Sequence, residues 1–363
     1  MTTHEPLPPG STIAILGGGR LGRMLAVAAA RLGLRTRVLS DRPDDPAFTV
    51  AAETYHHAFD DDAAIARFAT GADVVTYEFE NVPLSAIDNA LEHAPVHPGR
   101  RPLAITQDRL AERKFLDDCD IPVAPYVAVD SLQDLAQHAS KVALPAILKT
   151  RRFGYDGKGQ TSVNDVADLP AAWAAIAAQP AILERRINFQ RELSIIAVRG
   201  LDGATVFYDL TENHHADHVL RTSTVPARAP DSVEQAARRI AERIVAELDY
   251  VGTIAIEFFL VNKGGENTLL VNEIAPRVHN SGHWTLDAAH VDQFENHVRA
   301  IAGWPLGDTA RHSNAVMTNL IGEEVQTWQR LADKPATCLH IYGKRTARPG
   351  RKMAHVTTLS PMT

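Results

Sequence analysis

Hydrophobic positions at the start of the chain follow two spacings in turn. Residues 12–16 form a continuous apolar run that ends at a glycine triplet, which is typical of a buried parallel strand. The apolar side chains that follow recur every three or four positions, as on one face of a helix: Leu21, Met24, Leu25, Ala28 and Leu32. Gly33 supplies a left-handed stop, a strand follows at 35–39, and a helix at about 63–69 leads to a strand at 72–77. This alternation predicts a parallel α/β sheet with helical crossovers.

The pattern changes after prolines at positions 95, 98 and 102, so we place a domain boundary near residue 104. Residues 108–116 favour a helix. Short apolar runs then predict strands at 146–150, 183–184, 193–198 and 206–208. This part of the chain therefore indicates a mixed, largely antiparallel sheet.

The clearest helix spans residues 233–248, where hydrophobic side chains are spaced by three or four positions. Ser232 is its expected cap, and Gln235 is the expected capping-box partner. An apolar strand at 252–261, a turn at 262–267 and a second strand at 268–273 predict a β-hairpin.

The composition is that of a globular enzyme, with 45% hydrophobic and 22% charged residues. At 363 residues the chain exceeds the usual span of one core, so we expect two or three domains. The net charge of −7 argues against a nucleic-acid partner. Cys119 and Cys338 give no disulfide framework. With no secretory pattern at residues 1–10 and no apolar run of membrane-spanning length, we expect a cytoplasmic protein with no membrane partner.

The first glycine motif has more than one interpretation. Gly17, Gly19 and Gly22 follow a strand and open a helix, where backbone amides and the helix dipole can hold a phosphate. Asp41 ends the second strand, where a dinucleotide fold places its ribose-binding acid. A nicotinamide-dependent oxidoreductase would begin in this way. The alternative is that the glycines only let the helix approach the sheet closely.

A second glycine-rich loop, residues 153–160, follows the strand that carries Lys149. Glycines allow backbone amides to wrap phosphate oxygens, and lysines supply point charges for the anion. The loop is not a Walker loop, because Gly159 rather than Ser or Thr follows Lys158. It is either a phosphate-binding loop or a plain hairpin connection.

Two carboxylates frame the predicted hairpin. Glu257 lies within an apolar strand, where an unpaired charge is costly, and Glu273 closes the next strand. At about 4 Å two such charges repel by about 1 kcal/mol in water and about 4 kcal/mol at an effective dielectric near 20. Mg²⁺ would remove that conflict, because it binds carboxylates together with nucleotide phosphates and water. The alternative is two separate salt bridges, with Arg277 as one partner.

The histidines do not form a transition-metal pattern. His214, His215 and His218 lie in a polar stretch that we interpret as a loop, and residues 280–282 interrupt any helical face between His279 and His283. His279 or Arg277 could instead face an anionic intermediate.

Four stretches together resemble a known family. They are residues 17–24 (GGGRLGRM), 77–83 (YEFENVP), the loop 154–160, and 272–285 (NEIAPRVHNSGHWT). The chain resembles the 5-(carboxyamino)imidazole ribonucleotide synthases of the ATP-grasp superfamily over nearly its whole length, and the last stretch is the most specific. Arg20 stands where the family usually has glutamine, and Arg185 with Arg186 replaces a commoner small or neutral pair.

The resemblance implies a mixed α/β ATP-grasp fold in three parts. Residues 1–104 would form a Rossmann-like pre-ATP-grasp domain that helps to bind the ribonucleotide. Residues 105–188 would form a small central lid domain, and residues 189–363 a carboxyl-terminal ATP-grasp domain with the metal-binding carboxylates. ATP would lie between the lid and the last domain, and the family suggests a homodimer.

The resemblance also implies residue roles. The expected metal ligands are Glu257 and Glu273, for Mg²⁺ with Mn²⁺ as a substitute, and the expected catalytic residues are Arg277, Asp156 and Lys352. The expected ATP contacts are Arg109, Lys149, Gly154, Tyr155, Asp156, Gly157, Lys158, Gly159, Gln160, Glu184, Arg185, Arg186, Ile187, Glu192, His215, Asn272 and Glu273. The expected contacts to the ribonucleotide are Gly19, Tyr155, Asp156, Lys158, Arg277, Lys344, Arg351 and Lys352.

The implied reaction is the ATP-dependent carboxylation of aminoimidazole ribonucleotide by bicarbonate, through carboxyphosphate, in purine biosynthesis. Lys149 and Arg277 would surround the transferred phosphoryl group, Asp156 would orient the substrate amine, and no covalent nucleophile is expected. The alternatives are another ATP-grasp ligase, a nicotinamide-dependent oxidoreductase, and a nucleotide-binding module without turnover.

Overall fold

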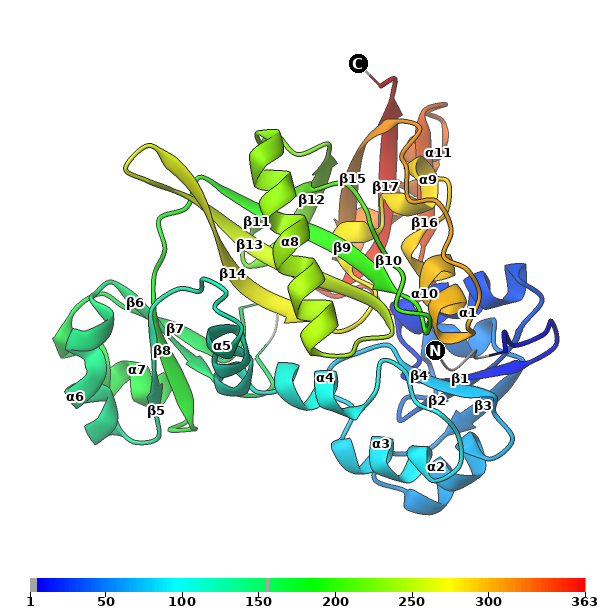
Figure 1. The fold of residues 1–363 in the computed structure, drawn as a ribbon, viewed down its shortest axis with the longest axis horizontal. Helices are drawn as coiled ribbons and strands as arrows, with labels where there is room; N and C mark the ends of the chain where they lie inside the picture. The colour runs from blue at the N-terminus through cyan, green and yellow to red at the C-terminus, as the bar shows by residue number, and fades with distance from the viewer. Residues whose placement is uncertain (1–4, 155–156, 363) are drawn as a thin grey trace.

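A computed structural model describes residues 5–154 and 157–362, and its strands form three sheets (Figure 1). The sheets follow one another along the chain, so each is built mainly from one continuous segment. None of the helices within the described ranges is both long and apolar enough to cross a membrane.

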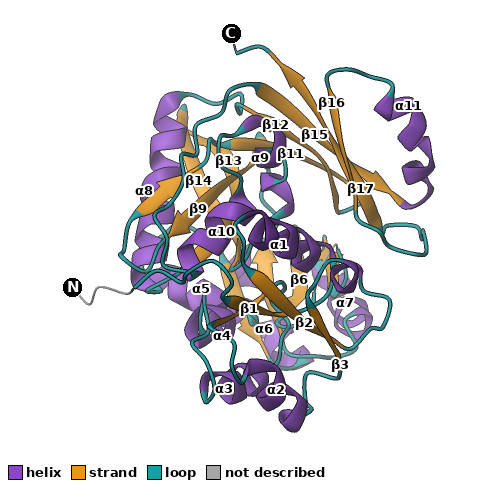
Figure 2. Cartoon of the chain, turned by 90° about the vertical axis from the view of Figure 1, so that its right-hand side faces the viewer, coloured by secondary structure: helices purple, strands orange, loops and turns teal. Residues whose placement is uncertain are grey.

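The amino-terminal sheet is parallel, as predicted, with the strand order β3-β2-β1-β4. These strands are β1 (Thr12–Leu16), β2 (Arg35–Ser40), β3 (Glu53–His56) and β4 (Val74–Tyr77). The helices are α1 (Arg20–Arg31), α2 (Asp62–Ala69) and α3 (Leu84–Leu91). The core that α1 shares with the sheet also includes α10 (Gln293–Ile301) from the far end of the chain, and Figure 2 shows these two helices side by side. The amino-terminal sheet is therefore fixed to the carboxyl-terminal part of the chain.

The central sheet is antiparallel and has the order β5-β8-β6-β7. Its strands are β5 (Tyr126–Val129), β6 (Ala146–Thr150), β7 (Gln160–Val163) and β8 (Ala181–Arg185). It shares a core with α6 (Leu132–Val142) and α7 (Leu169–Ala175), which lie at the left of Figure 1. The β6–β7 connection is the second glycine-rich loop.

The large sheet has nine strands in the order β14-β13-β9-β11-β12-β15-β17-β16, with β10 beside β9. The strands are β9 (Arg191–Arg199), β10 (Thr205–Phe207), β11 (Thr211–Ala216), β12 (Val219–Val225), β13 (Gly252–Lys263), β14 (Glu266–Ala275), β15 (Asn314–Ile321), β16 (Thr337–Ile341) and β17 (Lys352–Ser360). All recorded pairings are antiparallel, so the predicted antiparallel region is confirmed.

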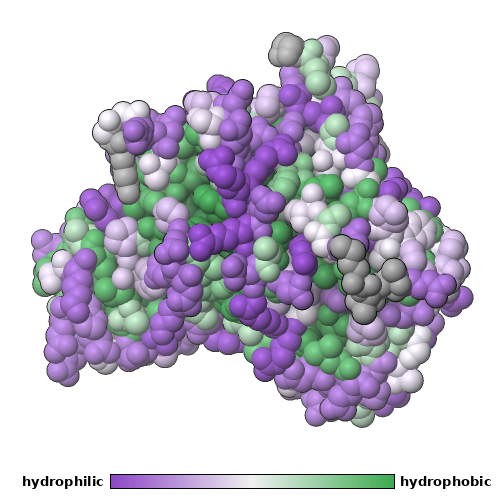
Figure 3. Space-filling model, in the orientation of Figure 1, coloured by the Kyte–Doolittle hydropathy of each residue, from purple (hydrophilic) through white to green (hydrophobic). Residues whose placement is uncertain are grey.

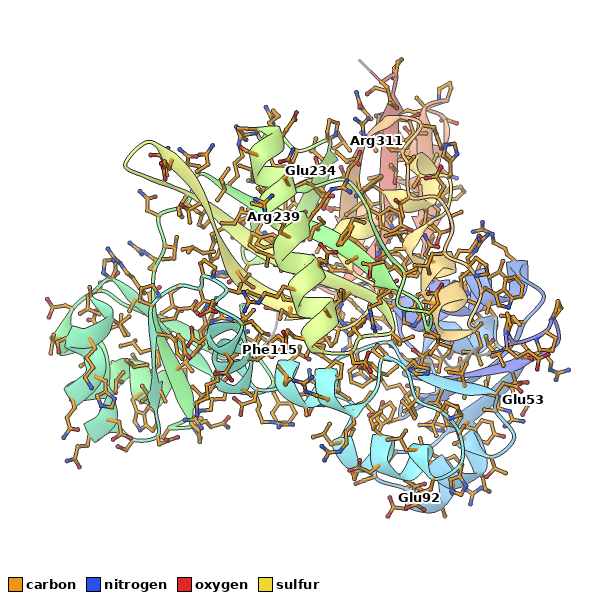
Figure 4. The ribbon with its side chains drawn as sticks, in the orientation of Figure 1. Glu53, Glu92, Phe115, Glu234, Arg239 and Arg311 are labelled. Atoms are coloured by element: carbon orange, nitrogen blue, oxygen red, sulfur yellow. The ribbon has the colours of Figure 1, made fainter. Side chains whose placement is uncertain are left out.

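Helix α8 (Asp231–Glu247) packs across this sheet. Its buried face shares a core with Phe115, while Glu234 and Arg239 point away from the sheet (Figure 4). The outward surface above it is strongly hydrophilic (Figure 3). The remaining helices are α4 (Arg100–Thr106), α5 (Arg109–Asp118), α9 (Thr285–Ala288) and α11 (Trp328–Ala332), with 3-10 turns η1 (Pro46–Thr49), η2 (Val166–Asp168), η3 (Asn280–Gly282) and η4 (Gly322–Thr327).

Three local predictions are wrong. Helix α8 begins at Asp231 after Pro230, so Ser232 lies inside its first turn and does not cap it, and Gln235 is not a capping-box partner. Pro230 holds an extended backbone before the helix, and acidic residues in the first turn complement the helix dipole instead. The hairpin turn is shorter than 262–267, because Gly264 and Gly265 both adopt positive φ and allow a tight two-residue turn.

The third error concerns the histidine segment. His214 and His215 lie in strand β11, between β9 and β12, rather than in a loop. The polar residues of this strand hid it from the hydrophobic pattern. His218 does lie in the following turn, with a positive φ.

The amino-terminal end of α5 offers a test of local stability. Asp108 Oδ1 accepts hydrogen bonds from the backbone N–H groups of Leu110, at 2.9 Å, and Ala111, at 3.3 Å. Asp108→Ala should cost about 1 kcal/mol of local stability, or about fivefold faster hydrogen exchange at these two amides. Asp118→Ala, at the exposed last residue of the same helix, is the control and should leave both amides unchanged. Equal hydrogen-exchange rates of the two amides in both variants would show that Asp108 does not stabilise the start of the helix.

Candidate active site

The two predicted metal carboxylates lie opposite each other. Glu257 on β13 pairs in register with Glu273 on β14, and a β-bulge follows Glu257 directly. Burial and the negative charge of Glu273 raise the pKa of Glu257 to about 7. The prediction that the hairpin brings these carboxylates together is therefore confirmed. The negative charge of Glu273 disfavours the ionisation of Glu257, which is the conflict that a bound cation removes.

Each carboxylate has one nitrogen neighbour. Arg109 Nη1 lies 3.7 Å from Glu273 Oε2, and His279 Nε2 lies 3.3 Å from Glu257 Oε1. His279 Nδ1 accepts the backbone N–H of Ser281, which leaves the ring proton on Nε2. Burial and the nearby Arg277 lower the pKa of His279 well below its usual value, so it faces Glu257 as a neutral donor. The alternative interpretation, in which Arg277 forms a salt bridge with one of the two carboxylates, is wrong, because Arg277 pairs with Glu80.

A buried network of charges connects four elements beside this pair. Arg113 of α5 lies 2.8 Å from Glu184 of β8 and 2.7 Å from Glu112, and it donates to the backbone oxygen of Asn272 in β14 at 2.7 Å. Lys149 of β6 pairs with the other oxygen of Glu184. Burial alone would raise the pKa of Glu184, but Lys149 and Arg113 outweigh it and lower that pKa to about 2. The network fixes the central sheet against β14.

Arg113 was missed by the sequence analysis. An arginine in a polar helix is usually an exposed residue, yet Arg113 is fully buried. Its position among the buried residues Glu112, Phe115 and Leu116 was the only available signal.

The second glycine-rich loop reaches from the central sheet toward the large sheet. A Cβ at Gly157 would lie 2.6 Å from the side chain of His218, in the β11–β12 turn, and Gly157 and Gly159 both have positive φ. Gln160 pairs with Lys149 across β6 and β7. Tyr155 and Asp156 lie outside the described residues, so their predicted roles stay predictions.

Other predicted ATP contacts lie around this loop. His215 and Glu192 are brought together at 2.8 Å. Burial would lower the pKa of His215, but the hydrogen bond with Glu192 and the charge of Glu257 outweigh it and raise that pKa. Arg185 and Arg186 are exposed and Ile187 is half-buried at the end of β8, where the backbone N–H groups of the two arginines already donate to proline carbonyls of the central domain.

The first glycine motif is already occupied by a side chain of the protein itself, that of Glu78. The backbone N–H groups of Gly19 and Gly22 donate to the two oxygens of Glu78, at 2.5 and 2.8 Å. A Cβ at Gly17 or Gly19 would overlap the Glu78 side chain, and a Cβ at Gly22 would lie 2.6 Å from the Gly17 carbonyl oxygen. The glycines therefore admit Glu78 and allow close packing. A dinucleotide phosphate would have to displace this buried carboxylate.

The basic residues predicted to bind the ribonucleotide form a second group. Lys344 Nζ donates to the carbonyl oxygen of Lys352 at 2.8 Å, and burial, with the nearby charges of Arg20 and Arg351, lowers the pKa of Lys344 to about 7. The positive charge of Lys352 partly opposes the rise in the pKa of Glu257 and adds to the lowering of the pKa of His279. Arg351 itself donates to the Thr346 carbonyl oxygen within its own loop. Lys352 is thus brought near Glu257, Lys344 lies near Glu78 and the Lys352 backbone, and Arg351 is turned toward its loop.

Comparison with known proteins matches three segments of the chain to family models. The family model of the ribonucleotide synthetase preATP-grasp domain matches residues 11–107, that of the ATP-grasp domain matches residues 114–294, and that of the phosphoribosylaminoimidazole carboxylase C-terminal domain matches residues 315–362. The N5-carboxyaminoimidazole ribonucleotide synthase of Brucella melitensis is 48% identical over 98% of both chains. The chain belongs to the N5-carboxyaminoimidazole ribonucleotide synthase family.

Solved structures agree with this membership. An ADP complex of an N5-carboxyaminoimidazole ribonucleotide synthetase superposes with a TM-score of 0.94 at 38% identity, covering 99% of this chain and 94% of the other. The Aspergillus clavatus synthase with ADP and 5-aminoimidazole ribonucleotide gives a TM-score of 0.90 at 29% identity, covering 98% and 95%. The predicted fold and ligase class are confirmed, and membership of the synthase family argues against the oxidoreductase and the non-catalytic module. The divisions predicted at residues 104 and 188 stay predictions.

The buried network allows a stability test. Arg113→Met removes the partner of Glu112 and one partner of Glu184, so it should lower the free energy of unfolding by about 3 kcal/mol or more. Urea denaturation measures the loss. Arg243→Met is the matched control, because Arg243 is half-exposed and its partner Asp120 is exposed; it should change stability by less than about 1 kcal/mol. A loss for Arg113→Met no larger than the control would contradict the role of the network.

Proposed function

We propose that the chain forms N5-carboxyaminoimidazole ribonucleotide by the ATP-dependent carboxylation of 5-aminoimidazole ribonucleotide, a step of purine biosynthesis. Family membership at 48% identity over 98% of the chain supports this reaction. The observation that carries the residue assignment is the pairing of Glu257 with Glu273 beside the Lys149–Glu184–Arg113 network. A relative's structure with ADP and 5-aminoimidazole ribonucleotide supports the two substrates that share the site.

Glu257 and Glu273 are the proposed magnesium ligands. Both present hard carboxylate oxygens, and their in-register pairing raises the pKa of the more buried partner, so the donor set fits Mg²⁺, with Mn²⁺ as a substitute. When bound, the ion supplies neutralisation of the phosphate charge. The surrounding protein positions both carboxylates through the hairpin and through Arg109 and His279.

The ATP phosphates are proposed to lie between the second glycine-rich loop and this pair. Arg109 and Lys149 supply positive charge, and the amides of Gly154, Gly157 and Gly159 can face phosphate oxygens. His215 with Glu192, Asn272 and residues 184–187 complete the proposed nucleotide contacts. Since phosphoryl transfer needs positioning and charge neutralisation above all, these residues require no covalent nucleophile.

The carboxylation is proposed to proceed in two steps. A bicarbonate oxygen attacks the terminal phosphorus of ATP, the bond to the ADP oxygen breaks, and carboxyphosphate forms. The amine of the ribonucleotide then forms the C–N bond as phosphate leaves and the amine gives up a proton. Arg277, held by Glu80, and Lys352 are proposed to stabilise the anionic intermediate, and Asp156 to orient the amine. Gly19, Tyr155, Lys158, Lys344 and Arg351 are the other proposed ribonucleotide contacts, and the proposed assembly is a homodimer.

The assignment predicts how activity depends on the carboxylates. ADP formation should require bicarbonate, Mg²⁺ and 5-aminoimidazole ribonucleotide, and Glu257→Gln or Glu273→Gln should lower kcat by at least about 100-fold. Glu266→Gln, at the exposed start of the same strand, is the control and should keep the wild-type rate. If ADP formation did not depend on the ribonucleotide, the proposed substrate would be wrong. If both site variants kept the wild-type rate, only the assignment of Glu257 and Glu273 would be wrong.

A second prediction concerns pH. The pKa of Glu257, raised to about 7 by burial and Glu273, lies above its unfolded value, so its contribution to stability is full below about pH 4.5 and is lost as pH rises through 7. Mg²⁺ binds the deprotonated pair, so its affinity should rise about tenfold per pH unit below 7 and level off above it, with proton release. Calorimetry in two buffers measures that release. Glu273→Gln should weaken the dependence of Mg²⁺ affinity on pH. A wild-type Mg²⁺ affinity that is constant between pH 6 and 8 would contradict the prediction.

A further inference from the structure

A cluster of side chains away from the carboxylate pair combines metal-ligating groups from three elements. His340 of β16 pairs in register with His355 of β17, and their rings are stacked with centroids 4.5 Å apart. The carboxylate oxygens of Asp287, from α9, lie 2.9 and 3.0 Å from His340 Nε2. One potential ligand atom from each of the three residues lies within 4.8 Å of the others.

His355 distinguishes this cluster from a chance contact between surface side chains. It is fully buried, and its Nδ1 is hydrogen-bonded to the hydroxyl of Tyr342 at 2.8 Å. Its Nε2 is buried and has no hydrogen-bond partner among residues 5–154 and 157–362. A buried nitrogen without a hydrogen-bond partner destabilises the fold, yet the protein retains one on His355, whose ring stacks on that of His340.

We propose that Asp287, His340 and His355 bind a divalent transition-metal ion of the zinc class. Two imidazoles and one carboxylate suit Zn²⁺ and its neighbours, whereas Mg²⁺ prefers oxygen ligands. Tetrahedral zinc holds its ligand atoms roughly 3.3–3.5 Å apart. The His340 and Asp287 atoms, at 2.9 and 3.0 Å, would move slightly apart, and His355, within 4.8 Å of both, would move closer. The proposal does not rest on the carboxylation reaction or on the magnesium pair.

The surroundings meet two further requirements of a metal site. Tyr342 can accept the Nδ1–H of His355, the type of outer contact that orients a metal-bound histidine. A groove of about 380 Å³, lined by Leu286, Tyr342 and His340 among others, gives an entry path to the partly exposed His340. Cys338, two residues before His340 on β16, is hydrogen-bonded to Asp287 and lies outside the three-ligand set.

A bound ion would join α9 to the last two strands of the large sheet. Helix α9 directly follows the 272–285 stretch, which supplies Glu273, Arg277 and His279 to the active site. The ion would thus hold the end of that stretch against β16 and β17, a structural rather than a catalytic role.

Cobalt is the probe that separates this site from the carboxylate pair. The full-length protein is titrated with Co²⁺ in excess Mg²⁺ and without nucleotide, and visible d–d absorption is recorded. We expect one Co²⁺ per chain, displaced by Zn²⁺. His340→Gln should weaken Co²⁺ binding by at least about tenfold, and His355→Asn should abolish it. His312→Gln is the matched control, because His312 and His290 form another histidine pair, with ring centroids 5.9 Å apart.

Thermal unfolding gives a second readout. Zn²⁺ should raise the Tm of the wild type and of His312→Gln but not that of His340→Gln or Asp287→Asn. Tyr342→Phe keeps the ring and should weaken Co²⁺ binding by about tenfold, which tests the site even if His355→Asn does not fold. No Co²⁺ binding by the wild type in excess Mg²⁺, or equal affinity in wild type and His340→Gln, would overturn the proposal.

Discussion

The rest of the site depends on one buried ion network, in which Arg113 and Lys149 share Glu184. Arg113 makes contacts to β8 and, through the Asn272 carbonyl oxygen, to β14, so a single side chain from α5 sets the central sheet against the large sheet. Such a network stabilises only when complete, because each member left alone is a buried charge without compensation. The relative position of the two sheets is therefore specified by charge complementarity rather than by apolar packing alone.

Glu257 and Glu273 differ from this network because two like charges lie together, next to Asn272, whose carbonyl oxygen accepts from Arg113. Glu257 and Glu273 face each other because they are paired in the β13–β14 register, and the bulge after Glu257 shifts that register for the remaining pairs of the hairpin. Glu184 is paired with the positive charges of Lys149 and Arg113, whereas Glu257 is paired with a second carboxylate. This difference separates the residues that fix the architecture from the pair that we propose as metal ligands.

The sequence predicted the elements whose apolar pattern is local. Strand 12–16, helix 233–248 and the hairpin that carries Glu257 and Glu273 all follow from spacing alone. Strand β3 was missed because its four residues alternate in exposure and are mostly polar, and the strand at His215 was missed for the same reason. Arg113 and Glu78 were missed because their partners are distant in sequence: Glu184 is 71 residues from Arg113, and Gly19 is 59 residues from Glu78. Only the folded chain brings these partners together.

The side chain of Glu78, which follows β4 and occupies the turn before α1, has a consequence for inhibitor design. In a dinucleotide-binding enzyme this turn is open to a pyrophosphate, and compounds that mimic the cofactor exploit it. Here the amides of Gly19 and Gly22 are committed to a carboxylate of the chain itself. Ligands built around that pyrophosphate contact therefore meet a turn whose amides are already occupied, so compounds that mimic a dinucleotide are not expected to bind to this turn.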